Sequence, residues 1–336
     1  MRIGANPLRN KKVKTNFYHR IIVPIFVPNL DDPYFENGLE VTQLCLQSLH
    51  KTRHSKSFLT VVNNGSCKEV THFLQQMYLE GKIDQLVHFK ENIGKIDAMI
   101  PIAREAQEPL ITLTDGDVLF KEGWIQAVEN VFLNFPKAGM VSPVPNPTFY
   151  RIYSENTLFD AFCKGLLKFK SVCQPEDLLA FAKSIGSETM YKKKSRLYKQ
   201  LIVEQKGRQA VVGCGHFVAT LRKEVFLKAP KSLSNMAYAS AADRDYIDIP
   251  NDKAGFWRLA TTNCYAYHIG NIPEPWMKSF EANLVSQNKT LDSIPKVKKS
   301  YLPLSIKKGV NKLWLNSYVR PFIFKYLGLD QGYNEY

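Results

Sequence analysis

Two aspartates with one glycine between them, Asp115 and Asp117, stand directly after a run of apolar and β-branched residues, Leu110 to Thr114. The run predicts a strand. Side chains two positions apart in extended backbone point the same way, and Gly116 lets the chain bend between them. Two carboxylates at a strand end offer the oxygen ligands that suit Mg²⁺ or Mn²⁺ carrying phosphate oxygens. The same triplet is also common in polar turns. The surrounding sequence is therefore needed to distinguish a metal site from a turn.

Polar residues also follow the strands predicted earlier in the chain, at residues 20–28, 57–62 and 85–89. Apolar residues at helical spacing fill the intervals between them. Strands alternating with helices predict an α/β fold with a doubly wound, mostly parallel sheet, and ligands bind beyond the carboxyl ends of such strands. The candidates at that edge are Pro24, Phe26, Asn63, Asn92, Gly94, Lys95, Asp115 and Gly116.

Composition narrows the class of protein. The chain has 336 residues, of which 45% are hydrophobic, enough to bury the core of one large domain or two modest ones. Its formal net charge of +14 indicates an anionic partner such as a nucleotide, a nucleic acid or an acidic membrane. Six cysteines without a C-x-x-C pair indicate reduced thiols in a cytoplasmic protein. The sequence shows no signal-peptide pattern and no apolar run near the ~18 residues of a membrane span.

The order of motifs resembles the family-2 glycosyltransferases of the GT-A fold, from about residue 20 to residue 271. Members use nucleotide-sugar donors, usually invert the anomeric centre and need a divalent metal. The likeness is carried by Pro24-Ile25-Phe26, Asn63-Asn64-Gly65-Ser66, Asn92-Ile93-Gly94-Lys95, Asp115-Gly116-Asp117, Asp243-Arg244-Asp245 with Lys253-Ala254-Gly255-Phe256 after it, and His268.

The sequence departs from the family pattern at two places. An acidic pair usually meets the uracil edge, and here it is Asn63-Asn64, which offers a donor as well as an acceptor. The usual Glu-Asp of the catalytic motif is Ala242-Asp243. These departures leave open the base of the nucleotide and the identity of the catalytic carboxylate.

The resemblance implies roles for the donor-site residues. Asp117 is the expected direct metal ligand, Asp115 binds a ribose hydroxyl or a metal-bound water, and His268 is a ligand from the far half of the sheet. An imidazole beside carboxylates suits Mn²⁺ better than Mg²⁺. Lys95 is expected near a phosphate or the base, and Asn63 at the nucleobase. Considered one at a time, these residues also have ordinary structural interpretations. His268 could be a core histidine, Lys95 a surface lysine and Asn63 a turn residue.

Inversion needs one displacement, so one carboxylate must take the proton of the acceptor hydroxyl. Asp243 is the first choice for this base and Asp245 the reserve. The alternative is a helix cap with an acidic first turn, which is compatible with catalysis. Gly215 and His216 are placed in the acceptor pocket, where His216 could also be a structural turn residue.

The sequence divides into five predicted segments. They are an N-terminal tail (1–19), a nucleotide-sugar-binding half (20–147), a helical insertion (148–208), an acceptor-binding and catalytic half (209–275) and a basic, aromatic helical tail (276–336). The last tail either lies at the inner face of the membrane as a peripheral contact or packs on the body.

These features predict an inverting hexosyltransferase that moves a sugar, favoured as a UDP-sugar, to a glycan or lipid-linked acceptor, in surface polysaccharide biosynthesis. The alternative is a non-catalytic protein of the same fold that binds nucleotide-sugar or polyanion. Nucleotidyl transfer also uses paired aspartates, but it usually has a Gly-Ser shortly before them, which is missing between Ala106 and Thr114. No nucleic-acid motif interleaves with the basic residues, so no nucleic-acid partner is expected.

Overall fold

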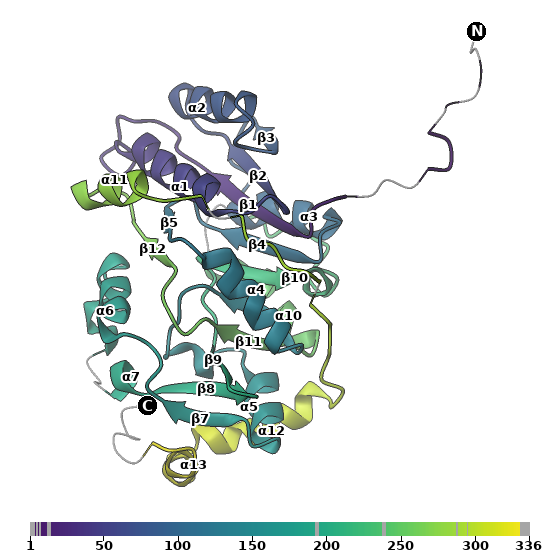
Figure 1. The fold of residues 1–336 in the computed structure, drawn as a ribbon, viewed down its shortest axis with the longest axis vertical. Helices are drawn as coiled ribbons and strands as arrows, with labels where there is room; N and C mark the ends of the chain where they lie inside the picture. Colours follow the sequence, from purple (N-terminus) through teal and green to yellow (C-terminus); the bar gives the residue numbers. More distant parts are fainter. Residues whose placement is uncertain are drawn as a thin grey trace.

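The computed structural model describes the chain except for residues 1–3, 5, 7, 12–14, 192–194, 237–239, 287, 294 and 330–336. Predictions for parts of the two tails therefore lie outside the described residues. The strands stack along the long axis of the molecule from β3 (Gln85–Phe89) to β7 (Leu167–Lys170), with helices on both sides of them (Figure 1). Helices α12 (Leu304–Leu315) and α13 (Arg320–Tyr326) lie at the end opposite α2 (Lys68–Leu79).

The first half of the chain alternates between strands and helices, as predicted. It comprises β1 (His19–Ile25), α1 (Gly38–Thr52), β2 (Ser57–Asn64), α2 (Lys68–Leu79), β3 (Gln85–Phe89), α3 (Lys95–Glu105), β4 (Leu110–Thr114), β5 (Val118–Phe120), α4 (Trp124–Asn134) and β6 (Ala138–Ser142).

The second half is less regular. It comprises η1 (Phe149–Arg151), α5 (Glu155–Cys163), β7 (Leu167–Lys170), α6 (Pro175–Ser184), η2 (Glu188–Tyr191), α7 (Ser195–Tyr198), β8 (Gln200–Gln205), β9 (Arg208–Val212), β10 (Val218–Arg222), α8 (Lys223–Phe226), α9 (Ser240–Asp243), a π-helical turn η3 (Arg244–Asp248), α10 (Ile249–Lys253), β11 (Trp257–Ala260), β12 (Ala266–His268), α11 (Pro275–Ala282), α12 (Leu304–Leu315) and α13 (Arg320–Tyr326).

The main sheet has ten strands in the order β3-β2-β1-β4-β10-β6-β11-β9-β8-β7 among the described residues. Strands β1 to β4 are mutually parallel, and β6 is parallel to β11. The antiparallel strands β10, β9 and β7 oppose the direction that the other strands share. The predicted mostly parallel α/β sheet is confirmed, with its antiparallel strands confined to the second half of the chain.

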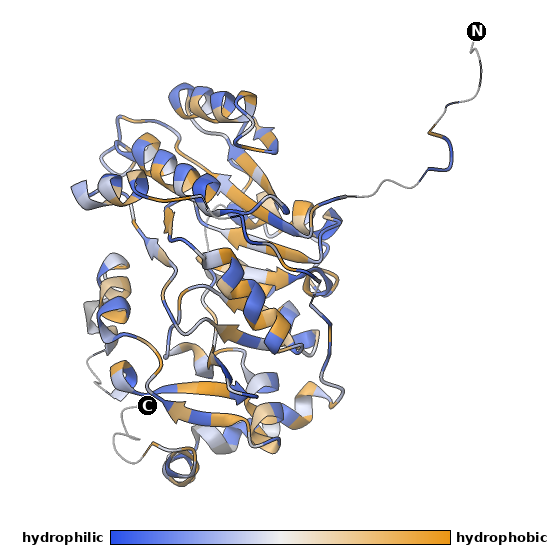
Figure 2. Ribbon diagram, viewed as in Figure 1, coloured by the Kyte–Doolittle hydropathy of each residue, from blue (hydrophilic) through white to orange (hydrophobic). Residues whose placement is uncertain are grey.

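The central strands are apolar on both faces because helices cover both faces. In β1, Ile21 and Val23 pack into one hydrophobic cluster while Ile22 packs into another, and all three are fully buried. Figure 2 shows the same pattern: the central strands are largely hydrophobic, and the helices that cover them carry both hydrophobic and hydrophilic residues. Each fully buried side chain of this kind stabilises the fold by roughly 1.5–3 kcal/mol. This burial explains why the continuous apolar runs in the sequence were readable as strands.

The prediction of helices alone between Thr148 and Lys206 is wrong in part. Strands β7 and β8 lie within this segment and extend the main sheet, since β8 pairs antiparallel with β9 and β7 pairs antiparallel with β8. Lysines alternate with apolar residues in β7, which is a strand pattern, but the run is only four residues long. The division of the chain into five segments stays a prediction.

A buried polar network holds the middle of the sheet to α4. Glu129 accepts hydrogen bonds from His19 Nδ1 (2.8 Å), His54 Nε2 (3.0 Å) and the Tyr18 hydroxyl (3.2 Å). The Lys56 backbone N–H donates to His54 Nδ1, so the hydrogen of His54 sits on Nε2, where a metal would have to bind. Although His19, His54 and Glu129 could be grouped as metal ligands, these bonds assign them to a hydrogen-bond network.

Replacing Glu129 with leucine is expected to lower the free energy of unfolding by roughly 3–5 kcal/mol. The change leaves three buried donors without their acceptor, and each unmet group keeps its full desolvation cost. Urea denaturation followed by circular dichroism measures the loss. Glu105→Leu, at the exposed end of α3, is the control. Equal stability of the two variants would contradict the role given to the network.

No helix in the described part of the chain is long and apolar enough to cross a bilayer.

Candidate active site

The loop between β4 and β5 carries the first two candidate residues. Gly116 lies against the end of β1, because a Cβ added to it would come within 2.7 Å of the Ile25 side chain and 3.2 Å of the Pro24 carbonyl oxygen. A larger residue here would require the Ile25 side chain to move and the Pro24 carbonyl to shift slightly. The packing places Asp115 and Asp117 beside the end of β1, at the edge predicted from the parallel strands.

His268 reaches this loop through a second, two-stranded sheet. Strand β12 pairs antiparallel with β5, and His268 lies opposite Val118. The Ile269 backbone N–H also donates to the Asp117 carbonyl oxygen at 2.9 Å. The His268 Nε2 atom is 3.5 Å from Asp117 Oδ2. A histidine 151 positions along the chain from Asp117 is thereby held beside it by backbone pairing.

The three predicted metal-site residues converge. One ligand atom from each of Asp115, Asp117 and His268 lies within 4.8 Å of the others. Asp117 Oδ1 and His268 Nδ1 are buried and have no hydrogen-bond partner among the described residues. Burial raises the pKa of Asp117, against the opposing effect of nearby His268. Two carboxylates and an imidazole with unmet polar atoms are a donor set that fits a divalent cation such as Mn²⁺.

Lys95 joins this cluster to the second acidic group. It is the first residue of α3, and Gly94 before it has a φ of 92°. The Lys95 Nζ atom is 2.5 Å from Asp115 Oδ1 and 3.5 Å from Asp243 Oδ1. Burial lowers the pKa of Lys95, but the two carboxylates outweigh burial and shift it upward. A permanently charged ammonium therefore stands between the candidate metal ligand and the candidate base.

The structure separates Asp243 from Asp245. Asp243, at the end of α9, is 8% exposed and faces Lys95, and burial raises its pKa against the effect of that lysine. The Asp245 side chain is 43% exposed and pairs with Arg244 through both carboxylate oxygens. Hydrogen bonds from Arg244 lower the pKa of Asp245. Of the two, Asp243 has the burial and the neighbours of a general base.

The amides at the second strand end are engaged within the protein. Asn63 Nδ2 lies 2.8 Å from Thr71 Oγ1 and 3.2 Å from His88 Nδ1, and Asn63 Oδ1 accepts the Ser66 N–H. Asn63 is nearly fully buried. Direct contact between Asn63 and a base stays a prediction. A bond donated from Asn63 Nδ2 would require one of its present bonds to break, whereas Oδ1 has a second lone pair.

The neighbouring amides order the loop that leads into α3. Asn64 Nδ2 donates to Asn92 Oδ1 at 2.9 Å, and the Ile93 N–H donates to Asn64 Oδ1. The Gly94 N–H donates to Asn92 Oδ1. Asn92 and Gly94 therefore position Lys95. Phe26 stands apart from this network, with a partly exposed ring packed edge-on against Phe35.

A sequence model described as Glycosyl transferase family 2 matches residues 33–226, more than half of the chain. The chain belongs to glycosyl transferase family 2. The match includes Lys95, Asp115 and Asp117, whereas Asp243 and His268 lie beyond it. No curated protein matches the chain.

Two solved structures are similar to this family-2 chain. One is the mannosyltransferase PcManGT from Pyrobaculum calidifontis in complex with GDP-Man and Mn2+, with 14% identity, a TM-score of 0.42, and coverage of 78% of this chain and 59% of that one. The other is S. aureus TarS 1-349, with 10% identity, a TM-score of 0.42, and coverage of 75% and 60%. The chain thus spans about three fifths of the length of these structures.

Sequence analysis of this family-2 protein missed Asp248. The π-helical turn η3 carries Asp248 inward, where its Oδ1 lies 3.0 Å from Arg258 Nη2 and 3.5 Å from His216 Nδ1. Asp248 and Arg258 are almost fully buried, and His216 is partly exposed. Gly215 packs beside Phe149. The single residue added by a π turn has no sequence signature, although such turns are frequent at functional sites.

Proposed function

We propose that the chain transfers a sugar from a nucleotide donor, favoured as a UDP-sugar, to a glycan or lipid-linked acceptor with inversion at the anomeric carbon. The observation that carries the proposal is the convergence of Asp115, Asp117 and His268 next to the Lys95–Asp243 pair. The three metal-site residues fit a metal-bound diphosphate, and Asp243 of the pair provides a base beside it.

The donor side uses Asp117, His268 and Asp115 as metal ligands. A divalent cation bound there, Mn²⁺ before Mg²⁺, would offset the negative charge that develops on the leaving diphosphate. Pro24, Phe26 and Gly116 form the edge against which the nucleoside lies, and Gly94 allows close approach of the backbone to it. Asn63 and Asn92 order that edge, in keeping with their hydrogen bonds inside the protein.

The acceptor side uses Asp243. Its carboxylate takes the proton of the acceptor hydroxyl while the hydroxyl oxygen bonds to the anomeric carbon. The bond from that carbon to the diphosphate oxygen breaks on the opposite face, and its electron pair leaves with the nucleoside diphosphate. One displacement inverts the centre. Gly215 and His216 line the acceptor pocket, and Asp248 orients the His216 ring.

The proposed setting is surface polysaccharide biosynthesis in the cytoplasm, at the inner face of the membrane. The six cysteines are free thiols, in keeping with a reducing compartment.

Replacing Lys95 with methionine is expected to move the acidic limb of the rate–pH profile to higher pH. Lys95 lowers the pKa of Asp243, so its removal raises that pKa. A base with a higher pKa is deprotonated only at higher pH, and the rate therefore falls earlier on acidification. The profile of kcat/KM measures the shift. Lys82→Met, at a half-exposed position outside the site, is the control, and an unmoved limb would contradict the assignment of Asp243.

A panel of nucleoside diphosphates, each with and without Mn²⁺, tests the donor site. A ligand that binds only the folded state raises the melting temperature by mass action. We expect a Mn²⁺-dependent rise with UDP, followed by release of UDP from a UDP-sugar when an acceptor is added. A rise without turnover for any donor and acceptor would favour the non-catalytic binding protein. No rise with any nucleotide would overturn the proposal.

A further inference from the structure

The C-terminal helices are anchored to the body by one face. Trp314 of α12 and Phe324 of α13 are buried in the same hydrophobic cluster as Phe169 of β7. The Phe169 backbone N–H donates to the Leu327 carbonyl oxygen at 2.7 Å. Lys307 of α12 is buried and pairs with Asp160 of α5 at 3.1 Å. These contacts fix which faces of α12 and α13 point away from the protein.

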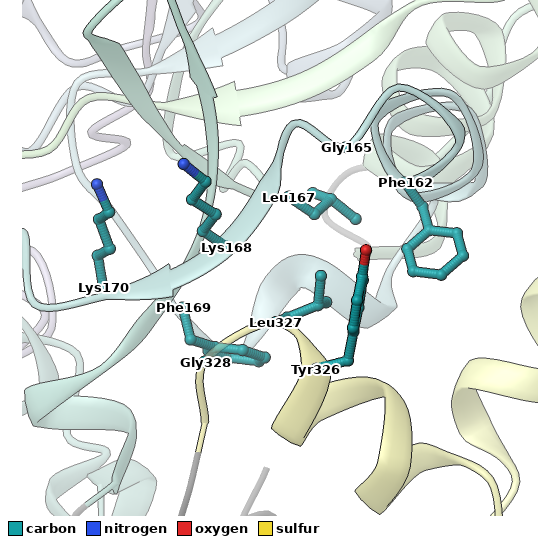
Figure 3. Close-up of a pocket in the computed structure, with 9 residues that line it drawn as sticks. All are labelled: Phe162, Gly165, Leu167, Lys168, Phe169, Lys170, Tyr326, Leu327 and Gly328. Carbon is teal, nitrogen blue, oxygen red and sulfur yellow. The ribbon is translucent and has the colours of Figure 1, made fainter.

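Three large aromatic side chains on α13 and in the turn before it are exposed to solvent. Tyr318, Phe322 and Tyr326 are 83%, 77% and 79% exposed. Phe322 and Tyr326 are four residues apart on α13 and therefore share a face of the helix, and Tyr318 lies in the turn that leads into it. We call these three residues the tail aromatic face. Tyr326 also borders a groove of about 410 Å³ between α13 and β7, where its ring lies beside Phe162 and Leu167 (Figure 3).

The surroundings of this face are strongly basic. The sequence contains no aspartate or glutamate from residue 293 to residue 329. The exposed lysines in this stretch include Lys308, Lys312 and Lys325. Lys168 and Lys170 extend from β7 at the groove, where Glu204 pairs with both of them. The aromatic rings therefore project from a positively charged end of the molecule.

We propose that the tail aromatic face docks the protein on the surface of an anionic lipid bilayer. Phe322, without a polar group, enters the boundary between headgroups and acyl chains, and the two tyrosines beside it keep their hydroxyls among the headgroups. The lysines around the rings meet the lipid phosphates. The proposal goes beyond sugar transfer and does not rest on it.

Charge and shape decide between a bilayer and other occupants. A second copy of the chain on the same face would bring two basic surfaces together, which is unfavourable. A single-stranded nucleic acid fits the charge. However, exposed rings gathered on one short helix and the turn before it form a compact apolar patch, which suits an interface better than a series of separate base-stacking platforms. The patch in a basic field fits an amphipathic element that lies on a membrane.

Sedimentation of the full chain with vesicles tests the proposal. We expect binding to vesicles of phosphatidylcholine mixed with phosphatidylglycerol, weaker binding to phosphatidylcholine alone, and a loss of binding as salt is raised. Replacing Tyr318, Phe322 and Tyr326 together with serine should lower the bound fraction at least about tenfold on the mixed vesicles. The control is Leu79→Ser, which removes an 84% exposed apolar side chain from α2 at the other end of the molecule.

A second variant keeps the test decisive if the serine variant does not fold. Lys308→Glu, Lys312→Glu and Lys325→Glu together leave the anchoring side chains in place, and this variant should lose binding to the mixed vesicles, with Lys90→Glu as the control. Thermal melts show that each variant is folded. Equal binding of the wild type to both kinds of vesicle, or unchanged binding of both variants, would overturn the proposal. So would an oligonucleotide that binds the wild type and not the serine variant while vesicles do not bind at all.

Discussion

Replacing Asp243 with asparagine is expected to lower kcat for sugar transfer by about 10³-fold, the usual contribution of a positioned general base. The amide is close in size to the carboxylate and cannot take a proton from the acceptor hydroxyl. Binding of the donor should change little, because the candidate metal ligands are other residues. Turnover of a UDP-sugar with an acceptor, together with the Mn²⁺-dependent thermal shift by UDP, measures the two properties separately.

The matched control for this variant is Asp245→Asn. Asp245 is of the same type, two residues away, and differs in that its side chain is exposed and paired with Arg244. We expect Asp245→Asn to keep most of the activity. A reversed result, with Asp245→Asn inactive and Asp243→Asn active, would contradict the assignment of Asp243 and indicate Asp245 as the base.

Replacing Asp117 with alanine is expected to abolish the Mn²⁺-dependent thermal shift by UDP and to lower transfer by at least about a hundredfold, since a bound cation supplies several kcal/mol of transition-state stabilisation. Asp117 is the carboxylate closest to His268, and its Oδ1 atom is buried without a hydrogen-bond partner among the described residues. Because a buried carboxylate oxygen without a hydrogen bond is costly, the ligand-free variant should melt at the same temperature as the wild type or higher.

Titration calorimetry with Mn²⁺ alone provides a measurement of this site that does not depend on turnover. Asp117→Ala should lose Mn²⁺ binding, while Asp31→Ala, in the exposed loop after β1, should keep it. Undiminished Mn²⁺ binding by Asp117→Ala would contradict the metal site built from Asp115, Asp117 and His268. It would leave Asp115 as a residue that only positions Lys95.

The sequence alone was sufficient to predict the parallel part of the sheet and the edge where the candidate site lies. Continuous apolar runs such as Leu110 to Thr114 can be buried only inside a sheet covered on both faces, so their type and position are legible one segment at a time. The Asp-Gly-Asp triplet follows such a run directly. The candidates at the carboxyl ends of β1, β2 and β3, among them Phe26, Asn63 and Asn92, lie at the same edge because parallel strands share a direction. The type and position of each strand depend on residues that are adjacent in the sequence.

The tertiary structure decided what depends on partners distant in sequence. The sequence favoured Asp243 over Asp245 as the base but left both open, and packing buries Asp243 against Lys95 and leaves Asp245 with Arg244. The four residues of β7, with lysines alternating with apolar residues, form a strand because β8 provides their hydrogen-bond partners. Asp248 comes to lie beside His216 through a π turn, and His268 lies beside Asp117 through the pairing of β12 with β5. Burial, charge pairing and strand pairing are properties of the folded neighbourhood, so no single segment of the chain encodes them by itself.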